Sequence, residues 1–189
     1  MATLRINRKP SFNEKKATQA AAILLKLNNG HMNYMKLIKL LYNIDREALK
    51  RWERPVTFDD FYSMPHGLVV SSTLDKAEQQ NPSVKSYWDN YIITKDLEDY
   101  LVEDCGDEEL SPSEINLITE MYEKYEDKNQ FDMAREHHDS KLFPEYQDPG
   151  TSCIKTDYET VLKVLGFTDD QIEEFTLDIE ELSYLEAMA

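Results

Sequence analysis

Cysteine and long apolar runs are scarce in this sequence, and each shortage excludes a class of protein. Only two cysteines, Cys105 and Cys153, occur in 189 residues, whereas small secreted scaffolds depend on several paired cysteines. No run approaches the roughly 20 apolar residues that a membrane-spanning helix needs. The segment Met1–Pro10 also lacks the apolar stretch of a signal peptide. We therefore expect a cytoplasmic protein.

Glycine is scarce too, and the signatures of catalysis are missing with it. The chain has five glycines, none in the G-x-G or G-K-[ST] spacing of a phosphate-binding loop. The histidines and cysteines lack the spacing of a metal site, since the neighbours His137 and His138 point to different faces of a helix. We expect no catalysis, cofactor or metal. An enzyme with a site assembled around His66 and His137 is the open alternative.

Acidic residues, in contrast, are abundant and unevenly distributed. Residues 1–54 carry 12 Lys and Arg against 4 Asp and Glu, a net charge of +8, while residues 55–189 carry 9 against 33, a net charge of −24. Such a surface repels nucleic-acid phosphate and attracts basic partners, although it also serves solubility alone. We expect no direct DNA binding and a basic protein partner.

The hydrophobic pattern predicts an α+β, predominantly α-helical fold with one small antiparallel β-hairpin, as a single domain over residues 1–189. A capping box at Ser11–Glu14 predicts a first helix that ends at Asn28–Gly30. The hairpin is predicted from Tyr87–Thr94 and Tyr100–Val102, with Lys95–Asp99 as its turn. Other helices are predicted over 33–52, from Thr57, over 68–80, from Ser111, over 131–138, from Thr156 and from Thr168.

The helix predicted over 33–52 has two faces. Its apolar stripe is Leu37, Leu40, Leu41, Ile44 and Ala48, and its polar stripe is Lys36, Lys39, Asn43, Arg46 and Lys50. The polar stripe is interpreted as a partner contact, as a solvated helix face, or as a set of cations that pair with acids from the C-terminal two-thirds of the chain. The candidate partner-binding residues are Lys36, Lys39, Tyr42, Asn43, Arg46, Lys50, Tyr62, His66 and Gly67.

A second group of residues suggests a structural motif around Asp45. This carboxylate lies near the apolar stripe, where a buried acid would hold a nearby turn, either at Arg54–Pro55 or at the Gly67 amide. Thr57 belongs to the same group because it follows that turn.

The order of these pieces resembles the Panacea domain, the domain of SocA-like antitoxins and of phage-associated GepA-type proteins. The resemblance covers roughly residues 12–175, and at Gly67-Leu68-Val69 the family usually has Gly-Pro-Val. It is carried by Lys36-Leu37-Ile38-Lys39-Leu40-Leu41-Tyr42, Asp45-Arg46-Glu47, Arg54-Pro55-Val56-Thr57, Gly67, the helix start Leu110–Ile115 and the helix 131–138.

This resemblance implies a protein that performs no chemistry. It implies an antitoxin that blocks a genetically linked toxin by direct binding, and one relative also acts as an adaptor that delivers its toxin to a protease. The open alternative in the same class is an acidic phage inhibitor that mimics nucleic acid and binds a basic host protein.

Overall fold

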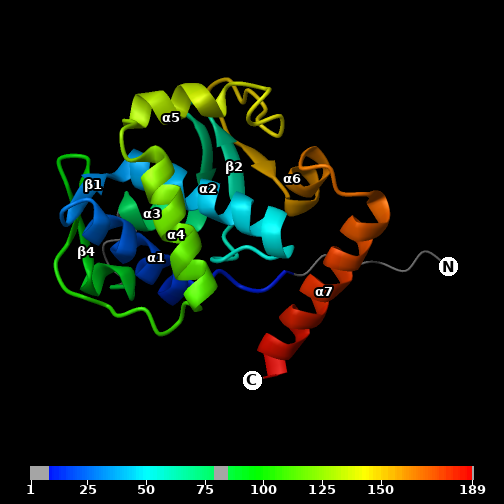
Figure 1. Cartoon of the computed structure of the whole chain (residues 1–189), viewed down its shortest axis with the longest axis horizontal. Coiled ribbons are helices and arrows are strands. Elements are labelled where there is room, and N and C mark those ends of the chain that lie inside the picture. The colour runs from blue at the N-terminus through cyan, green and yellow to red at the C-terminus, as the bar shows by residue number, and fades with distance from the viewer. Residues whose placement is uncertain (1–8, 79–84, 189) are drawn as a thin grey trace.

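Helices dominate the computed structural model, which describes residues 9–78 and 85–188 (Figure 1). The expected α+β, predominantly helical fold class is confirmed. Most of Met1–Pro10 and the predicted helix end at Gln79–Gln80 lie outside the described residues. The helices are α1 (Glu14–Leu27), α2 (Tyr34–Trp52), α3 (Ser71–Ala77), the 3₁₀ turn η1 (Trp88–Asn90), α4 (Pro112–Tyr125), α5 (Gln130–His137), α6 (Tyr158–Val164) and α7 (Asp169–Met188). The strands are β1 (His31–Asn33), β2 (Phe61–Met64), β3 (Gly67–Val70), β4 (Ile92–Lys95), β5 (Glu98–Leu101) and β6 (Ile154–Thr156).

The helix α2 lies at the centre of the molecule and is buried on most of its circumference. It packs against α1, α3, α4, α5 and α6 and against strands β1 and β3. A helix that is enclosed in this way buries its polar stripe as well as its apolar one. The expected apolar stripe forms part of the core, and Leu37, Leu40, Leu41, Ile44 and Ala48 are each fully buried.

Two antiparallel three-stranded sheets flank this helix, so the strand content is larger than one hairpin. The expected hairpin is present as β4 and β5, and β1 pairs with the outer edge of β5. Its turn is shorter than predicted, because Asp96 and Leu97 both adopt positive φ and close the hairpin in two residues. The second sheet has the order β3-β2-β6.

Strand β2 replaces the helix that was predicted to begin at Thr57, and that prediction is wrong. Phe58 has a φ of 55°, which is left-handed and cannot continue a right-handed helix. The Thr57 side chain is held by Asp45 and does not cap a helix. The aromatic residues that follow alternate between buried and half-buried positions in β2, as strand residues do.

The helix predicted over 68–80 is also partly wrong, because its first residues form β3. The segment Gly67–Val70 pairs with β2, and its two adjacent valines favour a strand. Helix α3 begins only at Ser71.

Helix starts that depend on capping residues agree well with the sequence. Ser111 and Glu114 form the predicted capping box of α4, Asp157 caps α6, and Thr168 bonds the Gln171 amide at the start of α7. The exception is α1, which is capped by Asn13, while Ser11 bonds Glu186 near the other end of the chain.

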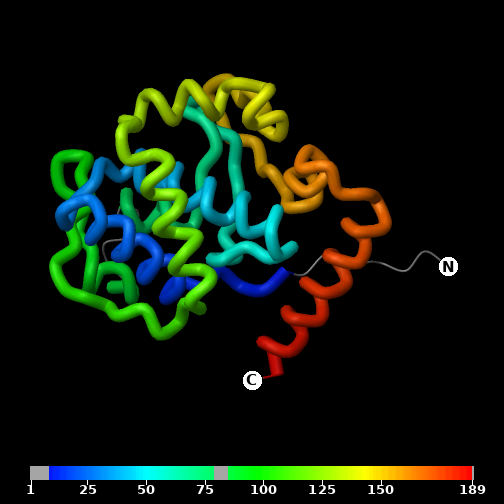
Figure 2. The backbone as a smooth tube through the Cα atoms, viewed as in Figure 1, coloured from blue at the N-terminus to red at the C-terminus, as the bar shows by residue number. Residues whose placement is uncertain are grey.

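Helix α7 runs along one side of the body and extends beyond it (Figures 1 and 2). It packs against α6 and buries only Phe175 and Ile179. The bonds from Ser11 to Glu186 hold its last turns.

Candidate functional site

The polar stripe of α2 lies mostly inside the protein. Lys39 is fully buried, Asn43 is 3% exposed and Lys36 is 8% exposed. The Lys36 ammonium donates to the Glu126 carbonyl at the end of α4. The interpretation of the whole stripe as a solvated face is therefore wrong, because α4, α5 and β3 cover it.

Lys39 ends in a small buried polar cluster with the backbone of β3 and the α5 residue His137. Its ammonium donates to the Leu68 carbonyl at 3.4 Å. Burial alone lowers the pKa of Lys39 to about 7. The pKa of His137 lies well below its ordinary value, first because of burial and then because of the nearby Lys39. The imidazole is therefore neutral at pH 7.

The neutral imidazole fixes how Asn43 is oriented. His137 Nδ1 lies 3.2 Å from the Leu68 carbonyl, and Nε2 lies 3.0 Å from Asn43 Oδ1. A neutral ring has one N–H, which goes to the carbonyl, so Nε2 needs a donor, and the Asn43 amide turned by 180° supplies it through its nitrogen. That orientation also gives this buried nitrogen, otherwise without a partner among the described residues, a hydrogen bond.

Gly67 closes the cluster because no side chain fits there. Its φ is +104°, and an added Cβ would lie 2.7 Å from the His137 Cβ and 2.9 Å from the Lys39 ammonium. The backbone of β3 can thus approach α5 closely only with glycine at this position.

Tyr42 and Arg46, one helical turn apart, both bind Glu145. The Tyr42 hydroxyl donates to Glu145 Oε1 at 2.8 Å, and Arg46 Nε donates to the same oxygen at 2.5 Å. The Glu145 side chain is fully buried and that of Arg46 is 17% exposed. Burial opposes the charge of Arg46, but the bonds to Glu145 outweigh it and raise the pKa of the guanidinium. The pair holds the loop after α5 against α2.

The other candidate partner-binding residues lie nearer the surface. Lys50 and His66 are exposed and Tyr62 is half-buried, whereas Gly67 is buried. His66 and the buried His137 thus do not form a common open site. Lys50, Tyr62 and His66 are the expected contact residues that a partner can reach.

Asp45 ties α2 to the turn that follows it. Its Oδ1 accepts from the amides of Val56 and Thr57 at 2.8 and 3.1 Å, and its Oδ2 accepts from the Thr57 hydroxyl. The contact is made after Pro55, not at Gly67. Burial raises the pKa of Asp45 to about 7, and the three donors counteract that rise. Pro55 is buried in the turn, and the exposed Arg54 lies over the Phe58 ring at 5.4 Å.

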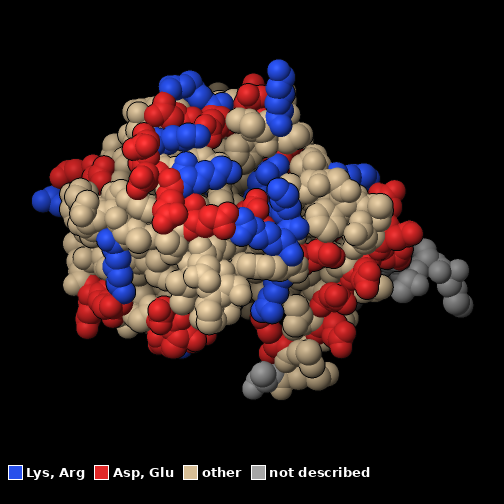
Figure 3. Space-filling view, viewed as in Figure 1, with Lys and Arg blue, Asp and Glu red and all other residues tan. Residues whose placement is uncertain are grey.

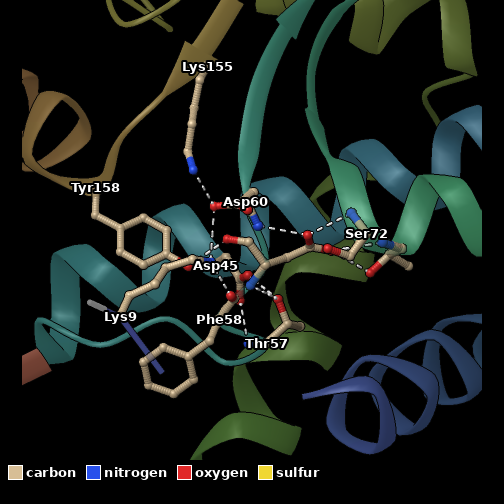
Figure 4. A network of polar contacts seen from close by, with 10 residues as sticks. Lys9, Asp45, Thr57, Phe58, Asp60, Ser72, Lys155 and Tyr158 are labelled. Carbon is tan, nitrogen blue, oxygen red and sulfur yellow. Dashed lines mark hydrogen bonds and ion pairs between the residues drawn. The ribbon is translucent and has the colours of Figure 1, made fainter. Parts of the chain in front are cut away.

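Two further aspartates extend this network (Figure 4). Asp59 accepts from the amides of Ser72 and Thr73, at 2.7 and 2.9 Å, and so caps α3 from a distant part of the chain. Asp60 lies between the ammonium groups of Lys9 and Lys155, at 3.2 and 3.0 Å. The loop after α2 is thereby connected to α3, to β6 and to the N-terminal segment.

A cavity of about 130 Å³ lies beside Asp60, between β6, α6 and α7. Its wall includes Lys9, Lys155, Tyr158 and Ile179. The Tyr158 hydroxyl donates a hydrogen bond to the Asp59 carbonyl at 2.6 Å. The lining thus combines one ion-paired side with one apolar side.

The sequence did not single out Glu145, Asp59 or Asp60, nor Lys9 and Lys155, which pair with Asp60. Acidic residues are numerous in this chain, and these three differ from the others only in their pairing with other segments. Asp59 follows the helix start predicted at Thr57, but the helix that Asp59 caps begins at Ser71.

The described residues contain neither a metal-binding cluster nor a membrane-spanning helix. Among residues 9–78 and 85–188, no three His, Cys, Asp or Glu side chains are arranged to hold a metal ion. Within the same described part of the chain, no helix is both long and apolar enough to span a membrane.

Comparison with family models matches residues 37–142 to the family described as antitoxin SocA-like, Panacea domain. The match covers more than half of the chain and runs from the first turn of α2 to the loop after α5. It includes Asp45, Gly67 and His137 and stops short of Glu145 and α7. Comparisons with curated proteins and with solved structures gave no match.

Proposed function

Because the chain belongs to the family of SocA-like antitoxins with a Panacea domain, we propose that it neutralises a genetically linked toxin by binding that protein directly. The observation that carries this proposal is the family match, whose span contains the whole α2–β3–α5 cluster. Within the polar stripe of α2, Lys36, Lys39, Asn43 and Arg46 make internal contacts, whereas Lys50 stays exposed. Such a framework is suited to presenting a fixed surface to another protein.

The toxin is proposed to be basic and the complex to be cytoplasmic. Residues 55–189 carry a net charge of −24, and acidic side chains are widespread on the face in Figure 3. An acidic surface accelerates the capture of a basic partner. It also disfavours DNA, because phosphate is repelled.

Co-expression tests the proposal. Each open reading frame adjacent to the gene is induced in a heterologous host with and without this protein, and growth is scored. The expected result is one neighbour that stops growth alone and forms a stable complex with this chain when growth is restored. If no neighbour is both toxic and relieved by this protein, the proposal is wrong.

The contact residues proposed for this binding are the reachable members of the predicted set. The triple variant Lys50→Glu, Tyr62→Ala, His66→Ala is expected to weaken toxin binding by at least about tenfold. Lys95→Glu, an exposed charge reversal in the β4–β5 hairpin, is the matched control and should bind normally. Equal affinity for both variants would place the toxin contact elsewhere.

A protease-adaptor role is the finer form of the proposal. After translation is stopped, the toxin is expected to disappear faster when this protein is present. In a set of host strains that each lack one cytoplasmic protease, the acceleration should be lost in the strain without the responsible protease. Equal toxin lifetimes would leave neutralisation by binding alone.

The net charge of −16 favours one second candidate, an acidic inhibitor that occupies a nucleic-acid site on a basic host protein. Tight binding to a host nuclease that nucleic acid displaces, together with the absence of a toxic neighbour, would support it.

A further inference from the structure

Helix α7 carries a second apolar stripe that the other described residues leave exposed. Leu177 is 55% exposed, Tyr184 is 49% exposed and Met188 is 84% exposed. At about 100° of rotation per residue, Tyr184 and Met188 project about 20° to either side of Leu177, so the three side chains lie within about 40° of one another. Phe175 and Ile179, the buried residues of α7, project from the opposite side of the helix. The stripe therefore faces outward.

Acidic side chains accompany this stripe as far as Glu181. The helix has no Lys or Arg and carries eight Asp and Glu over 169–188, and red acidic side chains follow it in Figure 3. By the same rotation, Glu174 and Glu181 lie on one side of the stripe and the half-buried Glu180 lies on the other, while Asp170 projects in line with the stripe. The result is an apolar strip with an acidic border.

The structure also holds α7 in place without using this face. Phe175 packs in the core and contacts the Tyr158 ring at 6.3 Å. At the far end, Ser11 donates to Glu186 through both its amide and its hydroxyl, at 3.0 and 3.2 Å. Glu186 lies on the same side as Phe175 and Ile179. Because these contacts fix the inner side of α7, binding at its outer face costs little further conformational entropy.

We propose that this outer face is a docking site for a basic polypeptide that presents apolar side chains between lysines or arginines. Leu177, Tyr184 and Met188 insert as anchors at helical spacing, and the bordering carboxylates pair with the basic side chains. Charge selects this occupant. Two copies of α7 would bring eight acids against eight, and nucleic acid or an anionic lipid surface would be repelled. If the proposed function holds, its toxin is the natural occupant, and only this identification rests on that function.

The direct test uses the full chain and two fluorescent helical peptides of about 18 residues, one of leucine and lysine and one of leucine and glutamate. The stripe variant Leu177→Ser, Tyr184→Ser, Met188→Ser keeps every acid of α7. The control variant Val102→Ser, Phe131→Ser, Leu142→Ser removes equally exposed apolar groups elsewhere. Circular dichroism of both variants checks that they are folded.

The leucine–lysine peptide is expected to bind the wild type and the control alike, and the stripe variant at least about tenfold more weakly. The leucine–glutamate peptide should not bind. Equal binding to the stripe variant would overturn the proposal, since charge alone would then suffice. A wild-type dimer that the stripe variant abolishes would also overturn it in favour of a second copy of this chain.

Growth rescue separates this inference from the proposed function. If the wild type and the control rescue the host from the toxin but the stripe variant does not, the toxin docks on α7. Full rescue by the stripe variant would keep the antitoxin function and remove α7 from the toxin contact. If the wild type does not rescue growth, the proposed antitoxin function is wrong. The peptide measurement would still decide whether α7 binds a basic chain.

Discussion

At the scale of single residues, the polar groups of α2 are the ones whose role depends most on their surroundings. Lys39 and Asn43 have the spacing of a solvated stripe, yet both end in a buried cluster with His137 and the Leu68 carbonyl. Burial of the Lys39 ammonium costs free energy because it removes the charge from water. The same burial lowers the pKa of Lys39, so a pH change of a few units alters its charge. Gly67 leaves the space that this cluster occupies.

Gly67→Ala tests that space against backbone strain alone. Gly166 is the matched control, because its φ of +95° is similar but nothing lies within 4 Å of an added Cβ. We expect Gly166→Ala to cost about 1 kcal/mol of unfolding free energy and Gly67→Ala at least about 2 kcal/mol more, through the clash with His137. Urea unfolding measures both. Equal losses would show that the cluster tolerates a methyl group.

Lys39→Met tests the buried ammonium through pH. The pKa of Lys39 is about 7 in the folded protein and ordinarily 10.5, so between these values the unfolded chain binds one more proton. The contribution of Lys39 to the free energy of unfolding of the wild type must therefore rise as the pH increases from 7 towards 10. Below pH 7 this contribution does not change. The free energy of unfolding of Lys39→Met minus that of the wild type should therefore fall by roughly 4 kcal/mol over that range.

Urea unfolding of both proteins at several pH values measures this difference, and titrations shared by the two chains cancel in it. The pKa of His137 lies far below this range, so its titration does not contribute. A difference that stays constant with pH would mean that Lys39 is solvated.

At the scale of elements, side chains that reach across the chain connect helices to loops. Asp45 fixes the turn after α2, Asp59 caps α3, and Glu145 fastens the loop after α5 to α2. Each carboxylate accepts hydrogen bonds from a segment that is distant in sequence or lies beyond a turn. The relative placement of the elements thus depends on a few buried acids as well as on the apolar core.

Glu145→Ala should detach the loop from α2. The change leaves Arg46 largely buried without its partner, and such losses typically cost about 3 kcal/mol or more. The matched control is Glu120→Ala, which removes the surface partner of Arg51, where both side chains are well exposed. Its cost should be far smaller, because solvent screens exposed pairs. Hydrogen exchange of residues 141–152 should accelerate in Glu145→Ala only.

At the scale of the whole molecule, charge and shape favour a basic partner. Lys36 and Lys39 of α2 are buried, while most acids of the chain are at least half-exposed and extend onto α7. Association with the proposed toxin should therefore slow by about tenfold or more between 50 and 500 mM salt, as expected for electrostatic steering. Stopped-flow mixing measures the rate. A rate that is insensitive to salt would contradict the steering role of the acidic surface.

Much of the architecture follows from the sequence because local signals determine it. The cap at Asn33, the capping box at Ser111 and the stop at Gly166 define their helices by bonds within a few residues. The β4–β5 hairpin follows from its aromatic and β-branched residues in the same way. Strand β3 was missed because its residues are compatible with a helix until β2 supplies partners for their amides.

Residue order and composition are enough to predict the helical character, the central amphipathic helix, the acidic excess and the family to which the chain belongs. These properties depend on composition and on order along the chain. The folded structure was needed to show that Lys39, Tyr42 and Asn43 face inward. It was also needed to show that Glu145 is the counter-ion of Arg46 and that one apolar face of α7 is exposed. The physical reason is that burial and pairing are set by groups from distant segments, and no local pattern specifies which of many acids will meet a given cation.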